Sequence, residues 1–340
     1  MTPNARFTEF ITDITPSTTT NNRSAAAHTS VRNALTNDAD YKNEVIRTFL
    51  GGSYKRKTAI RPVMKDGETE RPDVDIYVVV NGSEWSKSPE DIINDLYSAL
   101  NRSRTELNIT RLKRNRCSIA VSTDKADMDV SPLLERSWSG FYRIGNRNTG
   151  EWYNTDPEGH TTWSASVNKG AGNRFNPMVK MLKWNRREFP TKNKHPKSIA
   201  LEALVAKHMS RTETHYGKLL HDTFDDIVSA YSMSRFLGTC PTIEDPCVPG
   251  GDLLGGVSGE AFSAYYDKLE YFRDEARKGL DSATQETATK HWRRILGQRF
   301  PAPKSTGTTN SSALKSSIGV SPLSFPAKAS TPPNKPADFA

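Results

Sequence analysis

Hydrophobic residues follow the spacing of strands and helices in turn along the first half of the chain. Runs of β-branched and aromatic residues predict strands at 44–50 (EVIRTFL) and 73–80 (DVDIYVVV). Between them, KDGETERP predicts a turn or short hairpin. Helices are predicted over 22–35 and 88–100. A further hairpin is predicted from strands over 117–122 and 126–130, joined by the turn TDK.

The second half of the chain shows helical spacing alone. After a stretch from 135 to 172 that we expect to be a loop, helices are predicted over 178–189, 196–209, 219–237, 258–279 and 282–296. Beyond Phe300 the composition changes to Pro, Ser, Thr, Lys and Ala. Such a segment buries too little apolar surface to offset its ordering entropy, so we expect a disordered tail. These elements predict an α+β protein divided into residues 1–172, 173–300 and 301–340.

Charge and composition narrow the classes of partner. The chain has 47 Lys and Arg against 39 Asp and Glu, a net charge of +8, which favours an anionic partner such as a nucleoside triphosphate or a nucleic acid. No apolar run approaches the roughly 18 residues that a membrane helix needs. The N-terminus does not resemble a secretory signal, so we expect a cytoplasmic protein with no membrane partner. The three cysteines share no metal-ligand spacing, which argues against zinc.

Asp73 and Asp75 stand two positions apart at the start of a predicted strand. Their side chains project from one face of that strand, about 6.6 Å apart along the chain. Two carboxylates at that separation repel by about 2–3 kcal/mol at an effective dielectric of ~20. Mg²⁺ would relieve the repulsion, because it prefers carboxylate oxygens. A D-x-D pair taken alone is more often found on an ordinary strand whose acids face solvent beside Lys and Arg. The prediction of a metal site therefore needs support from other residues.

Two further features favour a metal site. Gly52, in GGSYKRKTAIRP, lets backbone N–H groups approach a phosphate closely, and Ser53 adds a hydroxyl donor. Asp129, in ADMDVSPLL on a neighbouring predicted strand, offers a third carboxylate and completes a site for two metal ions. Asp127 shares the face of Asp129, but it lies nearer the TDK turn, so we favour Asp129.

These motifs together resemble the DNA polymerase β-type nucleotidyltransferases, and among them the bacterial CD-NTases, relatives of animal cyclic GMP-AMP synthase and the oligoadenylate synthetases. FLGGSYKRKTAIRP and RPDVDIYVVV are similar to clade D of that family. MVKMLKWNRR resembles its Lys-x-x-Lys-Trp helix, and PKSIALEAL resembles the Ser-x-x-x-Glu segment that follows. The resemblance covers most of the chain. One departure is the longer spacing from Ser53 to Asp73, which a hairpin insertion would accommodate.

The resemblance implies a fold and a set of site residues. It implies a polymerase β-like core with a mixed sheet and an oligoadenylate-synthetase-like helical second lobe. Two Mg²⁺ ions would be ligated by Asp73, Asp75 and Asp129, with Asp129 accepting the proton of the attacking hydroxyl. The donor triphosphate would be contacted by Gly52, Ser53, Lys180 and Lys183. The alternative for the two lysines is a solvated helix face.

The resemblance also implies a cyclic oligonucleotide synthase. It would join ATP, with GTP as a candidate second substrate, into a cyclic di- or trinucleotide that a separate effector reads in anti-phage (CBASS) signalling. The rivals are a template-independent RNA nucleotidyltransferase or RNA-activated oligoadenylate synthetase, an enzyme that transfers AMP to an antibiotic or protein, and an inactive partner protein.

Two charged or terminal segments remain. The basic run RLKRNR at 111–116 could contact nucleic acid phosphates, but it lacks the interleaved aromatic residues of single-strand binders. We expect a solvated strand edge there instead. The Pro-rich tail ends at Ala340, and the resemblance to clade D implies that a ubiquitin-transfer-like enzyme conjugates this residue to a target.

Overall fold

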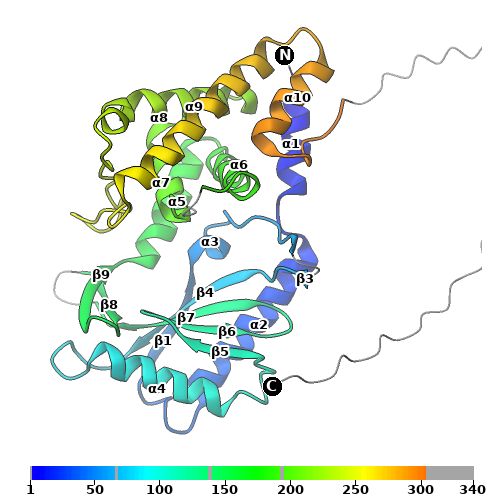
Figure 1. Ribbon diagram of the computed structural model, residues 1–340. Coiled ribbons are helices and arrows are strands. Elements are labelled where there is room, and N and C mark those ends of the chain that lie inside the picture. The colour runs from blue at the N-terminus through cyan, green and yellow to red at the C-terminus, as the bar shows by residue number, and fades with distance from the viewer. Residues whose placement is uncertain (1, 66–67, 137–139, 192–194, 304–340) are drawn as a thin grey trace, which may run out of the picture. The chain divides into compact units, whose positions relative to one another are not determined.

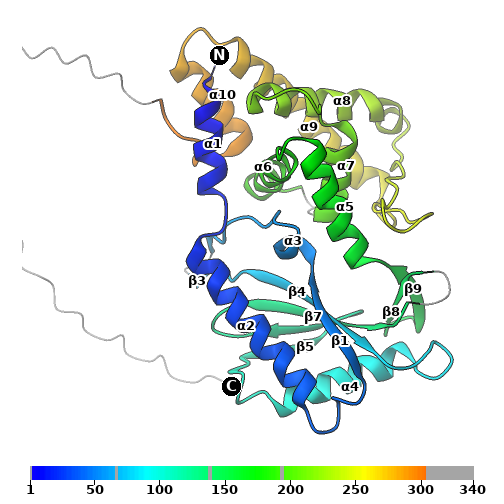
Figure 2. The ribbon, with the colours of Figure 1, turned by 180° about the vertical axis from the view of Figure 1, so that it is seen from behind.

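A mixed sheet of seven strands forms the centre of the first half of the chain (Figures 1 and 2). In this computed structural model, which describes residues 2–65, 68–136, 140–191 and 195–303, the strand order is β1-β4-β7-β6-β5, and β8 pairs with both β7 and β9. Strands β4 and β7 are parallel, and the other pairs are antiparallel. The strands are β1 (Val45–Gly51), β4 (Asp73–Val80), β5 (Arg111–Arg114), β6 (Ile119–Ser122), β7 (Asp127–Leu134), β8 (Tyr142–Asn146) and β9 (Glu151–Thr155). The predicted α+β class with a mixed sheet is confirmed.

Helices α2 (Thr18–Asn37) and α4 (Pro89–Arg102) pack against one face of this sheet. Their apolar residues form one buried cluster with alternate residues of β4 and β7. Ser88 caps α4 by accepting the Asp91 N–H. Because these helices cover one face, the residues at the intervening positions of β4 and β7 project from the opposite face.

A second core joins the helices of the second half. It contains residues of α6 (Phe175–Glu188), α7 (Ser198–His208), α8 (Tyr216–Phe236), α9 (Gly259–Asp281) and α10 (Gln285–Leu296). The first helix, α1 (Asn4–Asp13), belongs to this core as well and lies beside α10 in both ribbon views. The Phe7 and Trp292 rings meet edge to face with centroids 4.9 Å apart. The chain therefore starts among the late helices before it enters the sheet.

The expectation of a loop over 135–172 is wrong. Strands β8 and β9 form a hairpin there, and α5 (Pro157–Gly170) follows. The helix has a clear start, because Asp156 accepts the Gly159 N–H and Pro157 occupies the first turn. Few of its residues are buried, so apolar periodicity does not report it.

The remaining elements are short. Helix α3 (Gly52–Lys55) follows β1 directly, and β2 (Met64–Lys65) pairs with β3 (Glu68–Thr69) in the segment predicted to be a hairpin. In the described ranges, no helix has the length and apolar character needed to cross a membrane. Residues 304–340, which include Ala340 and all but the first three residues of the tail predicted over 301–340, lie outside the described residues. The proposed division at residue 172 stays a prediction.

Candidate functional site

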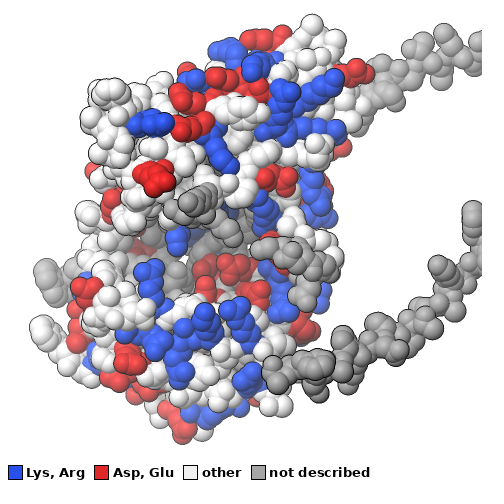
Figure 3. Space-filling view, viewed as in Figure 1, with Lys and Arg blue, Asp and Glu red and all other residues white. Residues whose placement is uncertain are grey.

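The pairing of β4 with β7 brings four carboxylates onto one sheet face. Asp73 is the register partner of Asp127, and Asp75 is the partner of Asp129. Neighbouring strands lie about 4.8 Å apart, and paired residues point to the same side of the sheet. On the opposite side, Val74 and Ile76 are fully buried. Figure 3 shows acidic side chains gathered in the hollow at the middle of that view, over the part of the sheet that β4 and β7 form.

Burial and the crowding of these carboxylates disfavour the charged forms of Asp73 and Asp75. Burial, followed by repulsion from Asp75 and Asp129, raises the pKa of Asp73 to about 7. Burial and then Asp129 also raise the pKa of Asp75. Only Asp127 has an ion-pair partner among the four in the described chain, since Arg71 lies 3.5 Å from its Oδ1. The other three have no ion-pair partner among the described residues, and only Arg56 and Lys183 partly offset their negative charge.

Asp129 is held in place by the turn between β5 and β6. Asn115 Nδ2 and Ser118 Oγ each donate to Asp129 Oδ1 over 3.2 Å. Among the described residues Asp129 Oδ2 makes no hydrogen bond, so it can accept a proton or bind a cation. Sequence reasoning missed both donors, because a short polar turn looks like any other turn until the register places it beside Asp129.

Gly52 lies directly over Asp75. The last residue of β1, Gly51, is the register partner of Asp75, and Gly52 follows with φ at +63°. A Cβ on Gly52 would come 1.5 Å from Asp75 Oδ2, so no other residue fits without moving the carboxylate. The next residue, Ser53, shapes the turn through its carbonyl, which accepts the N–H groups of Thr58 and Ala59. The predicted neighbourhood of Gly52-Ser53 and the D-x-D strand is therefore present in the structure.

The two lysines of α6 have different surroundings. Lys183 is 6% exposed, and its Nζ donates to the Thr58 carbonyl over 3.0 Å. Burial lowers the pKa of Lys183 to about 8, while Glu202 and Asp75 partly oppose that shift. Lys180 Nζ instead donates to Thr15 Oγ1 over 3.1 Å, between α1 and α2. The structure thus brings Lys183 close to the acids but gives Lys180 a partner elsewhere.

A buried ion pair ties the loop after Gly52 to the helical half. Arg56 Nε lies 2.8 Å from Glu202 Oε2, and Thr58 Oγ1 donates to Glu202 Oε1 over 2.9 Å. Glu202, on α7, is fully buried, and the Arg56 side chain is 8% exposed. Glu202 is the glutamate of the Ser-x-x-x-Glu segment, whereas nothing in the sequence marked Arg56 as its partner. Together with Lys183, this pair holds the 52–58 turn over the acids.

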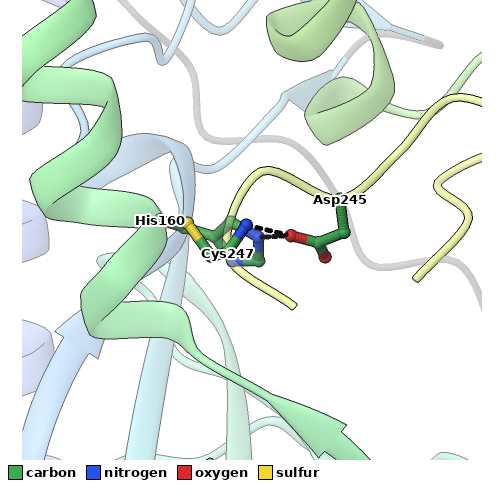
Figure 4. A group of neighbouring side chains, drawn as sticks. All are labelled: His160, Asp245 and Cys247. Carbon is green, nitrogen blue, oxygen red and sulfur yellow. Dashed lines mark hydrogen bonds and ion pairs between the residues drawn. The ribbon is translucent and has the colours of Figure 1, made fainter. Parts of the chain in front are cut away.

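A second group of polar side chains lies where α5 meets the loop after α8 (Figure 4). The donor atoms of His160, Asp245 and Cys247 all lie within 4.8 Å of one another. Asp245 Oδ1 already accepts hydrogen bonds from His160 Nε2 and from the N–H groups of Cys247 and Val248. These bonds fasten the loop to α5. Nitrogen and sulfur donors suit zinc better than magnesium, so a hard cation would take the carboxylates of the sheet instead.

The carboxylate site fits a divalent cation with oxygen ligands. Asp73, Asp75 and Asp129 converge on one face, and none is ion-paired within the described ranges. Burial first, and then repulsion between the carboxylates, raises the pKa of Asp73 and of Asp75, and a bound cation would offset both effects. Gly52 leaves the approach to them open. What the arrangement can do is bind cations beside a backbone turn that a phosphate could reach.

Comparisons with known proteins find similar sequences along the whole chain. Residues 1–168 match the Second Messenger Oligonucleotide or Dinucleotide Synthetase domain. Over 347 aligned positions the chain is 39% identical to the cyclic AMP-AMP-AMP synthase of Acinetobacter sp. (strain ATCC 27244 / 9458), covering 100% of this chain and 98% of that protein. It is 24% identical to the cyclic AMP-AMP-GMP synthase of Enterobacter hormaechei subsp. hoffmannii (strain UCI 50), covering 89% and 93%.

Solved structures show the same fold. A structure of E. coli MS115-1 CdnC with ATP superimposes with a TM-score of 0.71 at 17% identity and covers 88% of this chain and 99% of that one. The Vibrio cholerae DncV cyclic AMP-GMP synthase superimposes with a TM-score of 0.60 at 16% identity, covering 75% and 70%. With its synthetase domain, its full-length relative and its paired acids beneath a glycine turn, this chain belongs to the bacterial CD-NTases.

Proposed function

We propose that the protein is a cyclic oligonucleotide synthase that joins ATP, alone or with GTP, through successive phosphodiester bonds. The observation that carries the proposal is the register of β4 with β7, which sets Asp75 beside Asp129 under Gly52. The full-length similarity to a cyclic AMP-AMP-AMP synthase supports a product built from adenylate units. By resemblance to its family, the product would be a second messenger in anti-phage defence, read by a separate effector.

Each residue of the site has a part in that reaction. Asp73, Asp75 and Asp129 would hold two magnesium ions, which when bound neutralise polyphosphate charge and make a hydroxyl easier to deprotonate. Asp129 is fixed through Oδ1 by Asn115 and Ser118, so its other oxygen can accept the proton of the attacking hydroxyl. That hydroxyl oxygen bonds to the α-phosphorus of the donor while the bond from the α-phosphorus to pyrophosphate breaks, and pyrophosphate leaves.

The turn after β1 would hold the donor triphosphate. Gly52 permits close approach of the backbone, and Ser53 adds N–H and hydroxyl donors. Lys183 and the ion pair of Arg56 with Glu202 would hold the turn, and Lys183 would add positive charge beside the phosphates. Direct contact of Lys180 with a phosphate stays a prediction, and in the structure its Nζ donates a hydrogen bond to Thr15 Oγ1.

The test is product analysis with acid variants. Purified full-length protein with Mg²⁺ and all four nucleoside triphosphates should form phosphatase-resistant products that mass spectrometry identifies as cyclic, without added RNA. The variant carrying Asp73→Asn with Asp75→Asn should lose synthesis, and Asp129→Asn should lose it too. Asp127→Asn is the matched control, because its carboxylate lies on the same face but pairs with Arg71.

Three results would overturn the proposal. If the variant with Asp73→Asn and Asp75→Asn consumed labelled ATP at the wild-type rate, the two acids would not take part in the reaction. Products that appear only with RNA and are open to phosphatase would favour the RNA nucleotidyltransferase rival. A product with one nucleotide per antibiotic or protein acceptor would favour the AMP-transfer rival.

A further inference from the structure

A row of cations lies on the same sheet face as the catalytic acids. Strand β5 is the edge strand next to β6, and its register partners continue across the sheet without a break. Lys113 pairs with Ala120, which pairs with Asp129, which pairs with Asp75. Residues paired across a sheet project from the same side. Lys113 therefore projects from the face that carries Asp129 and Asp75.

The next row repeats this arrangement. Arg111 pairs with Ser122, which pairs with Asp127, which pairs with Asp73. The intervening residues of β5 point the other way: Leu112 packs against the core formed with α2 and α4, and the Arg114 guanidinium stacks 3.5 Å from the centre of the Tyr97 ring. Strand register and the burial of the alternate residues therefore both place Arg111 and Lys113 on the face that carries the acids.

These two cations are exposed, and no acidic residue in the described part of the chain pairs with them. Among the described residues, neither side chain makes a hydrogen bond or an ion pair, although many arginines of this chain do. In the paired rows of the sheet, Ala120 stands between Lys113 and Asp129, and Ser122 stands between Arg111 and Asp127. Both of these intervening side chains are small. Figure 3 shows Lys and Arg side chains gathered below the acidic hollow, over the region of β5 and β6.

The distance suits one nucleotide. Neighbouring strands are about 4.8 Å apart, so Lys113 stands two strands, or about 10 Å, from Asp129. A nucleotide whose sugar hydroxyl lies at Asp129 can extend its 5′-polyphosphate across that span along the floor. The donor triphosphate lies at the other end of the same row, because Gly51 is the partner of Asp75.

We propose that Arg111 and Lys113 bind the 5′-polyphosphate of the acceptor nucleotide, and of the linear intermediate once the first bond has formed. The inference rests on the proposed function and adds the acceptor subsite to it. This role gives a reason for two cations on the face of the acids, whereas a strand edge that is only solvated would not require them there. A linear intermediate that accepts a further nucleotide would keep its triphosphate at this row. Ring closure then requires that triphosphate to leave the row, because its own α-phosphorus is attacked at the acids and its pyrophosphate is the leaving group.

The experiment separates donor from acceptor with two analogues. Dideoxy-ATP, labelled at its α-phosphate, has no sugar hydroxyl and can only donate. α,β-Methylene-ATP has its hydroxyls but no cleavable bond between the α- and β-phosphorus atoms, so it can only accept. Adenosine offers the same hydroxyls with no phosphate. Transfer of label to each acceptor is measured for the wild type and for the double variant Arg111→Gln with Lys113→Gln.

The wild type should prefer α,β-methylene-ATP, and the double variant should lose that preference. Each charged contact to phosphate contributes about tenfold, so kcat/KM for α,β-methylene-ATP should fall about 100-fold while that for adenosine stays constant. Arg114→Gln, on the same strand but the opposite face, and the exposed Lys42→Gln should keep the preference. Thermal melting checks that all variants fold.

The opposing results are distinct. Equal losses for both acceptors, or no loss for either, would overturn the acceptor subsite. Loss of single-stranded RNA binding in the double variant, with the acceptor preference unchanged, would assign the row to nucleic acid and overturn it too. Failure of the wild type to use any acceptor, together with no product from ATP, would instead overturn the proposed function itself.

Discussion

Replacing Gly52 with alanine tests the closeness of the glycine turn to the acids. The added Cβ would lie 1.5 Å from Asp75 Oδ2 and 2.3 Å from its Cγ, distances at which no two unbonded atoms can remain. The Asp75 carboxylate must therefore rotate away, or the turn must lift. Either change separates the phosphate-binding backbone from the cation-binding face.

Two contributions set the size of the effect. Gly52 has φ at +63°, and alanine in this left-handed region costs about 1–2 kcal/mol of folding stability. The displacement of Asp75 adds a loss of activity, because a shift of about 1 Å in a reacting group costs about 100-fold in rate. We therefore expect Gly52→Ala to fold with reduced stability and to lose about 100-fold or more in kcat.

Gly238→Ala is the matched control. Its φ is +64°, but a Cβ there meets nothing within 4 Å, so it carries the same backbone strain without the collision. Denaturant unfolding should show similar losses of about 1–2 kcal/mol for the strain in both variants, while product formation falls only in Gly52→Ala. Wild-type rates in Gly52→Ala, or equal loss of rate in both variants, would refute the closeness of the turn to Asp75.

Three further predictions concern charge and the chain end. The pKa of Asp73 is raised to about 7, so the folded state binds more protons than the unfolded chain between about pH 4 and about pH 7. The folding stability measured without Mg²⁺ should therefore fall as the pH rises through this range. Asp73→Asn should flatten this pH dependence in melting curves, and an unchanged dependence would contradict the raised pKa. Glu202→Gln leaves Arg56 buried without a counter-charge and should cost about 3 kcal/mol in urea unfolding; a change under about 0.5 kcal/mol would contradict the buried pair. Deleting Ala340 should leave synthesis intact and abolish any covalent adduct seen on gels with the conjugating enzyme, so a surviving adduct would exclude this residue as the attachment point.

Local chemistry made several features predictable. The strand over 73–80 follows from β-branched residues and its bounding Pro72, and α4 follows from its Ser88 capping box. Gly52 and the D-x-D pair are short motifs, and each can be recognised from adjacent residues because a close backbone approach and two carboxylates on one strand face depend only on local sequence. Features that depend on partners far along the chain were missed. Helix α1 is buried only against late helices, and α5 shows little apolar periodicity.

The lysines of α6 show the same limit. Lys180 and Lys183 lie one turn apart on one helix face, so their spacing cannot separate them. Only the packing of α6 against α1 and the 52–58 turn sends one to Thr15 and the other to Thr58. The Arg56 pair with Glu202, 146 residues apart, is likewise invisible along the chain.

The sequence by itself indicated the elements over 44–50, 73–80 and 88–100, the paired acids and the glycine, because each depends on neighbours within a few residues. The tertiary structure alone decided which acids meet, since strand register, not spacing, sets Asp75 beside Asp129 and Asp73 beside Asp127. It also decided that Arg111 and Lys113 share their rows. The physical reason is that hydrogen bonds between strands link residues whose separation along the chain carries no information about their pairing.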